Sequence, residues 1–276
     1  MNECSANLLL FAAGLGTRLK PATDINPKPT IPLLSVPMGY YLLPYLQRVR
    51  FKNFVINTFH LPEKVISTYK KLNLNILFSE EKDFIKGSGG GLLQAKNLLS
   101  QNNPELFSII TANADEIFFT DEKNFLTNAL NQHQTTQSLA TLIVIKHPEA
   151  GHKFGAIWTI KNKVVSIGKE KPSAEAEPWH FVGVQILSNK IFNHLESNKE
   201  LNIFYDVLIH QLKTHDVSIY PINADWYETG NLIDYQKAKA DIHNILNNPS
   251  SIKYSMFKSH FDELEKYPKS ELSDLP

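Results

Sequence analysis

Two glycines and an arginine follow the first apolar run of the chain, at a spacing that suits the binding of an anion. Residues 8–11 predict a buried strand, and Gly14 and Gly16 stand in the loop after it. Because glycine has no Cβ, backbone N–H groups can approach an anion closely. Arg18 adds a fixed positive charge beside these groups. The segment therefore predicts a loop that binds a polyphosphate.

Two common phosphate-binding motifs do not fit this loop. A dinucleotide-binding fingerprint needs a third glycine three residues after Gly16, but Leu19 stands there. A P-loop needs Gly-Lys followed by Ser or Thr, and the loop contains no such run. A nicotinamide dehydrogenase is thus disfavoured, and we expect a different mode of phosphate binding.

The pattern that remains is long. It reads Ala-Ala-Gly-x-Gly-Thr-Arg-Leu-x-Pro-x-Thr over residues 12–23, followed by Pro27-Lys28-Pro29. This pattern resembles the signature of the sugar-1-phosphate nucleotidyltransferases. The resemblance extends from about residue 8 to residue 246. It implies a Rossmann-like three-layer α/β fold, with a mixed, mostly parallel central sheet and an antiparallel sugar-binding subregion.

A second glycine-rich segment is expected near the nucleotide. Gly87, Ser88, Gly89, Gly90 and Gly91 lie between a predicted strand and a predicted helix. Bare backbone at such a position can receive a base and a ribose. The alternative is a flexible turn, but five small residues in a row before an apolar helix favour close approach of a ligand.

An acidic residue closes the apolar run 107–112. Asp115 follows Asn113 and Ala114, so it should emerge at the carboxyl edge of the sheet, where open α/β sheets bind ligands. A carboxylate beside a triphosphate suits Mg²⁺, which prefers hard oxygen ligands. The alternative role for Asp115 is the N-cap of a following helix. The resembled family usually has glycine or serine where this chain has Ala114.

The later part of the chain carries the segments that the family uses for its sugar phosphate. Glu170-Lys171-Pro172 resembles an E-K-P segment whose lysine holds the sugar phosphate and whose glutamate contacts sugar hydroxyls. The strand 181–184 follows and contains Gly183, as the family's glycine-bearing strand does.

A second acidic position departs from the family pattern. Residues 226–230 read Trp-Tyr-Glu-Thr-Gly and resemble W-x-D-x-G, whose acid is the second metal ligand. The acid here is Glu228, which is one methylene longer. Asp225 lies nearby but should point to the opposite side of the strand, which makes it the weaker candidate.

These matches together imply that an NTP and a sugar 1-phosphate give an NDP-sugar and pyrophosphate. Arg18 would hold the β- and γ-phosphates, Lys28 the α-phosphate and Lys171 the phosphate of the nucleophile. Asp115 and Glu228 would hold Mg²⁺, the one cofactor implied. The resemblance places the nucleotide against Ala12, Ala13, Gly14, Gly16, Thr17, Gly87, Ser88, Gly89 and Gly90, and the sugar against Asn113, Glu170 and Gly183.

The elements that must position these residues alternate in the first part of the chain. Apolar runs predict strands at 8–11, 54–57, 75–78 and 107–112, and helical spacing predicts helices at 38–50, 62–71 and 92–99. Strands that alternate with helices favour a parallel sheet. Pro44 either kinks the helix 38–50 or marks its late start.

After residue 138 strand patterns dominate. Strands are predicted at 139–145, 156–160, 164–167, 181–187 and 217–221, a hairpin turn at 161–163, and helices at 203–213 and 233–246. We therefore expect one nucleotidyltransferase domain over 1–246, with a nucleotide-binding half at about 1–137 and a sugar-phosphate half at about 138–230. Residues 247–276 are polar with scattered aromatics and form a tail or helix that packs on the domain or mediates assembly.

Composition excludes several other classes of protein. The 276 residues contain 28 Lys and Arg and 28 Asp and Glu, so no net field favours nucleic acid or an anionic membrane. Cys4 is the only cysteine, which excludes an intrachain disulfide and fits a reducing cytoplasm. No apolar run reaches the roughly 20 residues of a membrane span. We expect a cytoplasmic monomer or homodimer whose partners are an NTP and a sugar 1-phosphate.

Within the family, the short length, the absence of an appended domain and the loop Gly-Ser-Gly-Gly-Gly are most similar to the bacterial N-acetylmuramate 1-phosphate uridylyltransferases of cell wall recycling. Two alternatives stay open. One is a guanylyl-, thymidylyl- or uridylyltransferase acting on mannose, heptose or glucose 1-phosphate. The other is a catalytically weak regulatory relative, which Glu228 and Ala114 suggest but which has no need for the full set of charges.

Overall fold

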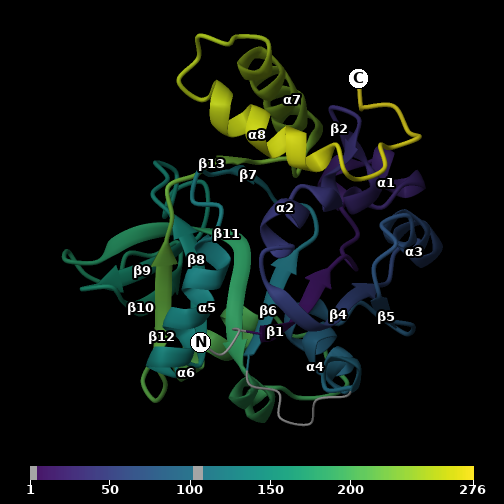
Figure 1. Ribbon diagram of the computed structural model, residues 1–276. Helices are drawn as coiled ribbons and strands as arrows, with labels where there is room; N and C mark the ends of the chain where they lie inside the picture. The colour runs from purple at the N-terminus through teal and green to yellow at the C-terminus, as the bar shows by residue number, and fades with distance from the viewer. Residues whose placement is uncertain (1–4, 102–107) are drawn as a thin grey trace.

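Nine strands form one mixed sheet in the computed structural model, which describes residues 5–101 and 108–276 (Figure 1). Their order across the sheet is β5 (Ile76–Glu80), β4 (Arg50–Thr58), β1 (Ser5–Phe11), β6 (Ser108–Asn113), β11 (Glu177–Ser188), β8 (Ala140–Ile145), β12 (Val217–Pro221), β10 (Lys163–Gly168) and β9 (Ala156–Ile160). Two small ladders pair β2 (Pro32–Leu33) with β3 (Val36–Pro37) and β7 (Ile117–Phe119) with β13 (Asp225–Tyr227).

The sheet has two parts that differ in strand direction. β5, β4, β1 and β6 are parallel neighbours, whereas β11 runs antiparallel to β6, β8 and β9. The strands predicted at 156–160 and 217–221 have those bounds. Lys161 and Asn162 form the predicted hairpin turn, with φ angles of 50° and 64°. Cys4 and Phe107, where the predicted strand 107–112 begins, lie outside the described residues.

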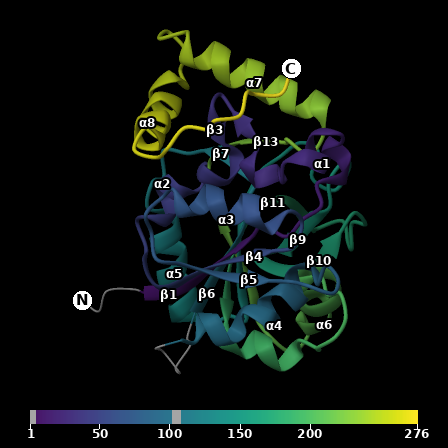
Figure 2. The same cartoon turned by 90° about the vertical axis from the view of Figure 1, so that its right-hand side faces the viewer.

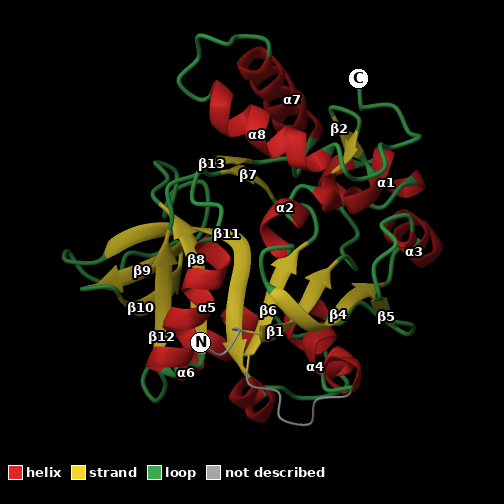
Figure 3. Ribbon diagram, in the orientation of Figure 1, coloured by secondary structure: helices red, strands yellow, loops and turns green. Residues whose placement is uncertain are grey.

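Helices cover both faces of the sheet (Figure 3). Because successive strand residues point to opposite faces, Leu8 and Leu10 belong to one hydrophobic core and Leu9 to the other. Side chains of α2 (Leu43–Leu46), α3 (Pro62–Lys70) and α5 (Phe125–Thr136) complete the first core. Side chains of α4 (Gly87–Leu99) and of the π-helix Ile203–Leu208, which leads into α6 (Ile209–Gln211), complete the second. The fold therefore has the three layers that were expected.

The predicted helix 38–50 is wrong. A 3₁₀ turn at Met38–Tyr40 precedes the four-residue α2, and β4 already begins at Arg50. Pro44 lies in the first turn of α2, where its missing N–H costs no helical hydrogen bond, so it marks a late start. Residues 36–46 are all buried, so their apolar pattern does not distinguish one face of a helix.

The start of α4 also differs from the prediction. The helix begins at Gly87 rather than at residue 92, so the glycine segment is helical and not a loop. Glycine in a helix is about 1 kcal/mol less favourable than alanine, which is why the sequence disfavours this start. The other short helical turns are Thr17–Leu19, Ala22–Ile25 (α1), Lys28–Thr30 and Asn189–His194.

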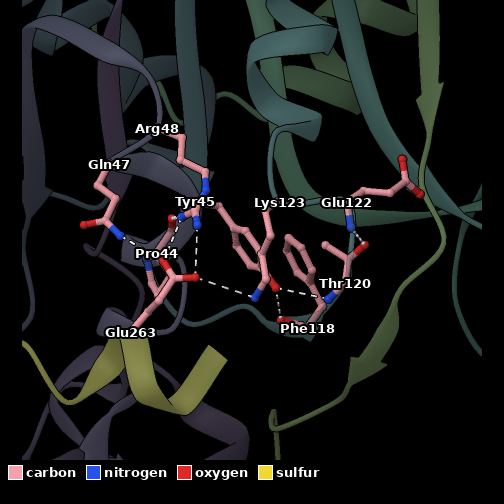
Figure 4. Close-up of polar contacts among 9 residues, drawn as sticks. All are labelled: Pro44, Tyr45, Gln47, Arg48, Phe118, Thr120, Glu122, Lys123 and Glu263. Carbon is pink, nitrogen blue, oxygen red and sulfur yellow. Dashed lines mark hydrogen bonds and ion pairs between the residues drawn. The ribbon is translucent and has the colours of Figure 1, made fainter. Parts of the chain in front are cut away.

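Residues after 231 form a helical cap beside β7 and β13 (Figures 1 and 2). It consists of α7 (Leu232–Leu246) and α8 (Tyr254–Leu264). Phe257 of α8 stacks on Phe119 of β7 with 4.0 Å between ring centroids. Glu263 accepts hydrogen bonds from both guanidinium ends of Arg48, at 2.8 and 3.0 Å, and lies 3.7 Å from Lys123 (Figure 4). The segment 247–276 thus contains a helix that packs on the domain.

The last residues of the chain return to the first half of the domain. The carboxylate of Asp274 accepts hydrogen bonds from the N–H groups of Leu34 and Ser35, at 3.1 and 2.9 Å, in the turn between β2 and β3. The hydroxyl of Tyr235 accepts from Leu275 N–H and donates to Pro32 O. No helix of the described residues is long and apolar enough to cross a membrane.

Candidate active site

A pocket of about 230 Å³ opens at the carboxyl ends of the parallel strands β1, β4 and β6. Open parallel sheets bind ligands at this edge because their loops converge there. The wall combines the end of β1, the glycine loop, the start of α4 and the end of β6. Its lining residues are Phe11, Ala13, Gly14, Asn57, Ile85, Gly87, Ser88, Asn113 and Asp115. The structure therefore brings together residues that the sequence assigned to the nucleotide, to the sugar and to the metal.

The two glycines of the first loop have different roles. Gly16 adopts φ +61°, and a Cβ there would lie 2.7 Å from Thr23 Cγ2, while Thr23 Oγ1 donates to Gly16 O at 2.9 Å. Gly14 has no atom within 4 Å of the position of a Cβ, so its backbone faces open space. Thr17 begins the following 3₁₀ turn and is exposed. Gly16 thus shapes the loop and Gly14 offers its backbone.

Ala12 is buried beneath this loop. Its N–H donates to Asn57 Oδ1 at 2.8 Å, so this amide is already occupied by the protein. The structure therefore gives Ala12 a supporting position, whereas Ala13 lines the pocket.

Lys28 and Asp115 meet at the pocket. Lys28 Nζ lies 2.7 Å from Asp115 Oδ2, and the two side chains are 12% and 31% exposed. The lysine begins the 3₁₀ turn Lys28–Thr30, and its neighbours Pro27 and Pro29 restrict the backbone there. A partly buried cation therefore stands next to the carboxylate predicted to hold the metal.

Arg18 and Glu228 form a second pair of a cation and a carboxylate. Arg18 Nη1 lies 4.0 Å from Glu228 Oε1, and the arginine side chain is 70% exposed, so the attraction is weak and the guanidinium is accessible. Glu228 Oε1 also accepts from Gly230 N–H at 2.6 Å. A Cβ at Gly230 would lie 2.7 Å from Arg18 Nη2 and 2.3 Å from Glu228 Oε1, so any other residue would displace the ends of both side chains.

Glu116 contacts the pocket-lining Asn113, and sequence reasoning missed it. Its oxygens accept hydrogen bonds from Asn113 Nδ2 and Trp226 Nε1, both at 2.9 Å. Burial, reinforced by the charge of Asp115, raises the pKa of Glu116 to about 7. Gly183, at φ +75°, has no space for a Cβ, which would lie 2.1 Å from Glu116 Cγ. The sequence offered one signal for Glu116, namely its position directly after Asp115 and close to the end of a predicted strand.

An aromatic cluster holds Trp226 in place for this contact. The ring centroids of His180, Phe154 and His147 lie 4.3, 5.4 and 5.7 Å from that of Trp226. Burial lowers the pKa of His180 to about 4, so this imidazole is neutral at neutral pH and packs as an apolar ring. The cluster joins β11, β13 and the loop after β8.

The second glycine segment packs against the protein itself. Gly89 N–H donates to Leu201 O at 2.7 Å, Leu201 N–H donates to Lys86 O at 2.9 Å, and Ile203 N–H donates to Ser88 Oγ at 2.9 Å. A Cβ at Gly87 would lie 2.5 Å from Leu201 O. Corresponding positions at Gly89 and Gly90 would lie 2.9 Å from Leu201 Cβ and 2.8 Å from Lys86 Cβ. The sequence predicted that a ligand lies close to this backbone. In the structure, residues 199–203 of the protein occupy most of that position.

Glu170 and Lys171 lie in the loop after β10. Both side chains are exposed, and neither makes a hydrogen bond or ion pair with another described residue. Asp225 is engaged elsewhere, because Lys253 of the C-terminal segment forms an ion pair with it. The structure thus brings Arg18, Lys28, Asp115 and Glu228 into two pairs and does not bring Lys171 to either of them.

Comparison with known proteins assigns the chain to a family. The profile described as Nucleotidyl transferase matches residues 7–245. The chain belongs to this family. It is 27% identical over 249 residues to the UTP–glucose-1-phosphate uridylyltransferase of Synechocystis sp., covering 83% of this chain and 61% of that protein. It is 24% identical over 233 residues to the mannose-1-phosphate guanyltransferase of Schizosaccharomyces pombe, covering 82% and 61%.

This nucleotidyl transferase chain spans about three fifths of the length of these two relatives. Its fold is similar to that of UDP-glucose pyrophosphorylase in a crystal structure with UDP-glucose. That match has a TM-score of 0.70 at 21% identity and covers 87% of this chain and 98% of that one. The expected family and fold class are thereby confirmed.

Proposed function

We propose that the protein transfers a nucleotidyl group from an NTP to a sugar 1-phosphate, giving an NDP-sugar and pyrophosphate. The observation that carries this proposal is the pocket itself, where the open backbone of Gly14, the start of α4 and the Lys28–Asp115 pair converge. The names of the two relatives, a uridylyltransferase and a guanyltransferase of sugar 1-phosphates, support the same reaction. Residues 1–137 would bind the nucleotide and residues 138–230 the sugar phosphate.

The positions of the cations suit the charges that this reaction develops. An oxygen of the sugar 1-phosphate attacks the α-phosphorus in line, the bond to the β-phosphate breaks, and pyrophosphate departs. Lys28 neutralises the α-phosphate in the pocket, and the accessible Arg18 holds the departing phosphates. The exposed Lys171 binds the phosphate of the nucleophile. Catalysis then rests on positioning and charge neutralisation, without a covalent intermediate.

Asp115, which lines the pocket of Gly14, and Glu228, which lines a second pocket with Trp226 and Tyr227, would hold a magnesium ion that is shared with the nucleotide. Both are carboxylates, and each already lies next to a cation that is proposed to hold phosphate. Among the described residues no group of three or more His, Cys, Asp or Glu could hold a metal, so phosphate oxygens must supply other ligands. When bound, Mg²⁺ supplies Lewis-acid neutralisation of the phosphate oxygens.

For the substrates we propose UTP and N-acetylmuramate 1-phosphate, because of the Gly-Ser-Gly-Gly-Gly segment. Mannose, heptose or glucose 1-phosphate with GTP, dTTP or UTP is the alternative. A regulatory protein that binds nucleotide sugars is the second alternative, favoured by Glu228 at the usual position of aspartate.

Pyrophosphate release separates these functions. The four NTPs are combined with N-acetylmuramate, mannose, heptose and glucose 1-phosphates in the presence of Mg²⁺, with Lys28→Ala as the inactive control. We expect the highest kcat/KM for UTP with N-acetylmuramate 1-phosphate. Faster release with another pair would reassign the substrates. Absence of release with every pair would refute the transferase and, with tight binding of an NDP-sugar, favour the regulatory protein.

A further inference from the structure

A buried carboxylate lies behind the nucleotide pocket and outside the predicted site. Glu81 follows β5 directly, is 2% exposed, and its N–H donates to Thr58 O at the end of β4 at 2.8 Å. Acidic side chains are almost never fully buried unless they are paired or hydrogen-bonded. Glu81 has no cation in hydrogen-bonding contact among the described residues, so neutral donors must satisfy its oxygens.

Both oxygens of Glu81 accept hydrogen bonds. Oε1 accepts from Asn57 Nδ2 at 2.8 Å, and Oε2 accepts from the backbone N–H of Lys86 at 2.7 Å. Burial raises the pKa of Glu81, and the two donors oppose this effect by favouring the charged form. The carboxylate therefore acts as an acceptor on both sides.

Asn57 extends this contact to the phosphate-binding loop. Its Oδ1 accepts from Ala12 N–H at 2.8 Å, while its Nδ2 donates to Glu81. β5, β4 and β1 are adjacent in the sheet, so the chain of hydrogen bonds crosses three neighbouring strand ends (Figure 1). It joins Lys86, the residue before α4, to Ala12, the first residue of the glycine loop.

The direction of each hydrogen bond between Ala12 and Lys86 is fixed. Ala12 N–H and Lys86 N–H can only donate, and an ionised carboxylate can only accept. The amide of Asn57 therefore has one satisfactory orientation, with oxygen toward Ala12 and nitrogen toward Glu81. Gly91 leaves the required space, because a Cβ there would lie 2.7 Å from Asn57 Nδ2 and 2.8 Å from Glu81 Oε1.

We propose that Glu81 is a positioning residue that couples the two nucleotide-binding segments, holding the glycine loop through Asn57 and the start of α4 through Lys86. Glu81 lies behind the pocket, whereas Asn57 lines it. The coupling places Ala13 and Gly14 at a fixed distance from Gly87 and Ser88. This inference rests on the proposed function only in assigning an NTP to the pocket.

Glu81→Gln tests the coupling with the smallest change in volume. A glutamine has one acceptor oxygen, so either Lys86 N–H or Asn57 Nδ2 faces an NH₂ group. We expect the dissociation constant for the preferred NTP to rise roughly tenfold or more, since hydrogen bonds to a charged group are strong. The KM for the sugar 1-phosphate should stay within about twofold of wild type. Glu80→Gln, at the exposed neighbouring position, is the matched control and should change neither value.

The double variant Asn57→Asp with Glu81→Gln restores the pattern. The carboxylate introduced at position 57 would accept from Ala12 N–H and from the NH₂ group of the glutamine introduced at position 81. The oxygen of that glutamine would accept from Lys86 N–H. All three hydrogen bonds return, so the Ala12 N–H should regain its wild-type protection from exchange. Nucleotide affinity is not the readout for this variant, because the carboxylate at position 57 lines the pocket and repels a triphosphate. This variant also keeps the test valid where the single change prevents folding.

Hydrogen exchange reports on the coupling without any substrate. The amide of Ala12 should exchange faster in Glu81→Gln than in wild type and slow again in the double variant, measured by NMR on folded protein. Unchanged Ala12 exchange in Glu81→Gln, or wild-type NTP affinity in that variant, would overturn the coupling. A wild-type protein that binds no NTP would instead refute the proposed function. The exchange rate of Ala12 N–H would still test the coupling, because it is measured without a substrate.

Discussion

The chain has two glycine-rich segments at one pocket, and Gly14 of the first differs from the glycines of the second in what surrounds its backbone. In the loop 12–16, Gly14 faces open space where a ligand can approach the backbone. In the segment 87–91, the positions of the missing Cβ atoms are approached by the protein itself: by Leu201 at Gly87 and Gly89, by Lys86 at Gly90, and by Asn57 and Glu81 at Gly91. A glycine in the sequence indicates that the space beside its backbone is needed. The sequence around it does not show whether a ligand or another part of the protein uses that space.

The largest effect should come from the cations next to the open loop. Lys28→Ala should lower kcat/KM about 100-fold or more, because one preorganised charge on the reacting phosphates is lost. Arg18→Ala should act in the same direction, and both variants should unfold at the wild-type urea concentration. Lys20→Ala is the control, because this exposed lysine pairs with Asp24. Turnover within a few-fold of wild type in both variants would contradict the assignment of this loop to phosphate.

The second prediction concerns the carboxylate of Glu228, which pairs with Arg18. Glu228→Gln can still accept the hydrogen bond from Gly230 N–H, so stability should hold, but it loses the charge that Mg²⁺ prefers. We expect turnover to fall roughly 30-fold at saturating Mg²⁺. Glu228→Asp should keep partial activity, because aspartate is the usual residue of this pattern. A glutamine variant as active as wild type would limit Glu228 to its contact with Gly230.

Alanine at the two kinds of glycine should separate binding from stability. Gly89→Ala should lower the free energy of unfolding by about 1–2 kcal/mol despite the better helix propensity of alanine, because its Cβ meets Leu201. Gly14→Ala should leave that free energy within about 0.5 kcal/mol of wild type and raise the KM for NTP. Urea denaturation and steady-state kinetics measure the two quantities. If both variants lost only nucleotide affinity, the two segments would not differ as described.

The smallest expected effect concerns Ser88. Ser88→Ala removes the acceptor of the buried Ile203 N–H and should lower the free energy of unfolding by about 1 kcal/mol. The KM for NTP should change less than twofold, because the hydroxyl is engaged by the protein. A large rise in that KM at unchanged melting temperature would place Ser88 with Gly14 among the ligand contacts.

The sequence predicted most strands correctly because apolar runs between turn residues are a local signal, as β9 and β12 show. It predicted α4 and its end but placed the start too late, because helix propensity is also local, whereas the hydrogen bond that Gly89 donates goes to Leu201, more than a hundred residues later. It missed α5 altogether, since Phe125–Thr136 is rich in Asn, Gln and Thr, and only a few apolar residues face the core.

The residues of the candidate site also divide into those with a local sequence signal and those defined by contacts that are distant in sequence. Arg18, Lys28, Asp115 and Glu228 could be identified because each belongs to a contiguous pattern. Glu116 could not, because its significance comes from Trp226 and Gly183, which reach it across the fold. Nor could the series of hydrogen bonds from Glu81 to Ala12, whose three residues lie at or next to the ends of three different strands.

The contact of Asp274 with Leu34 and Ser35 bears on how this protein is made. These N–H groups belong to the hairpin that follows Lys28, and their partner is translated some 240 residues later. Because domains begin to fold during synthesis, the N–H groups of this turn bind water rather than Asp274 until residue 274 has left the ribosome exit tunnel. A stalled chain lacking those residues should therefore be more open to proteolysis between β2 and β3 than the released protein.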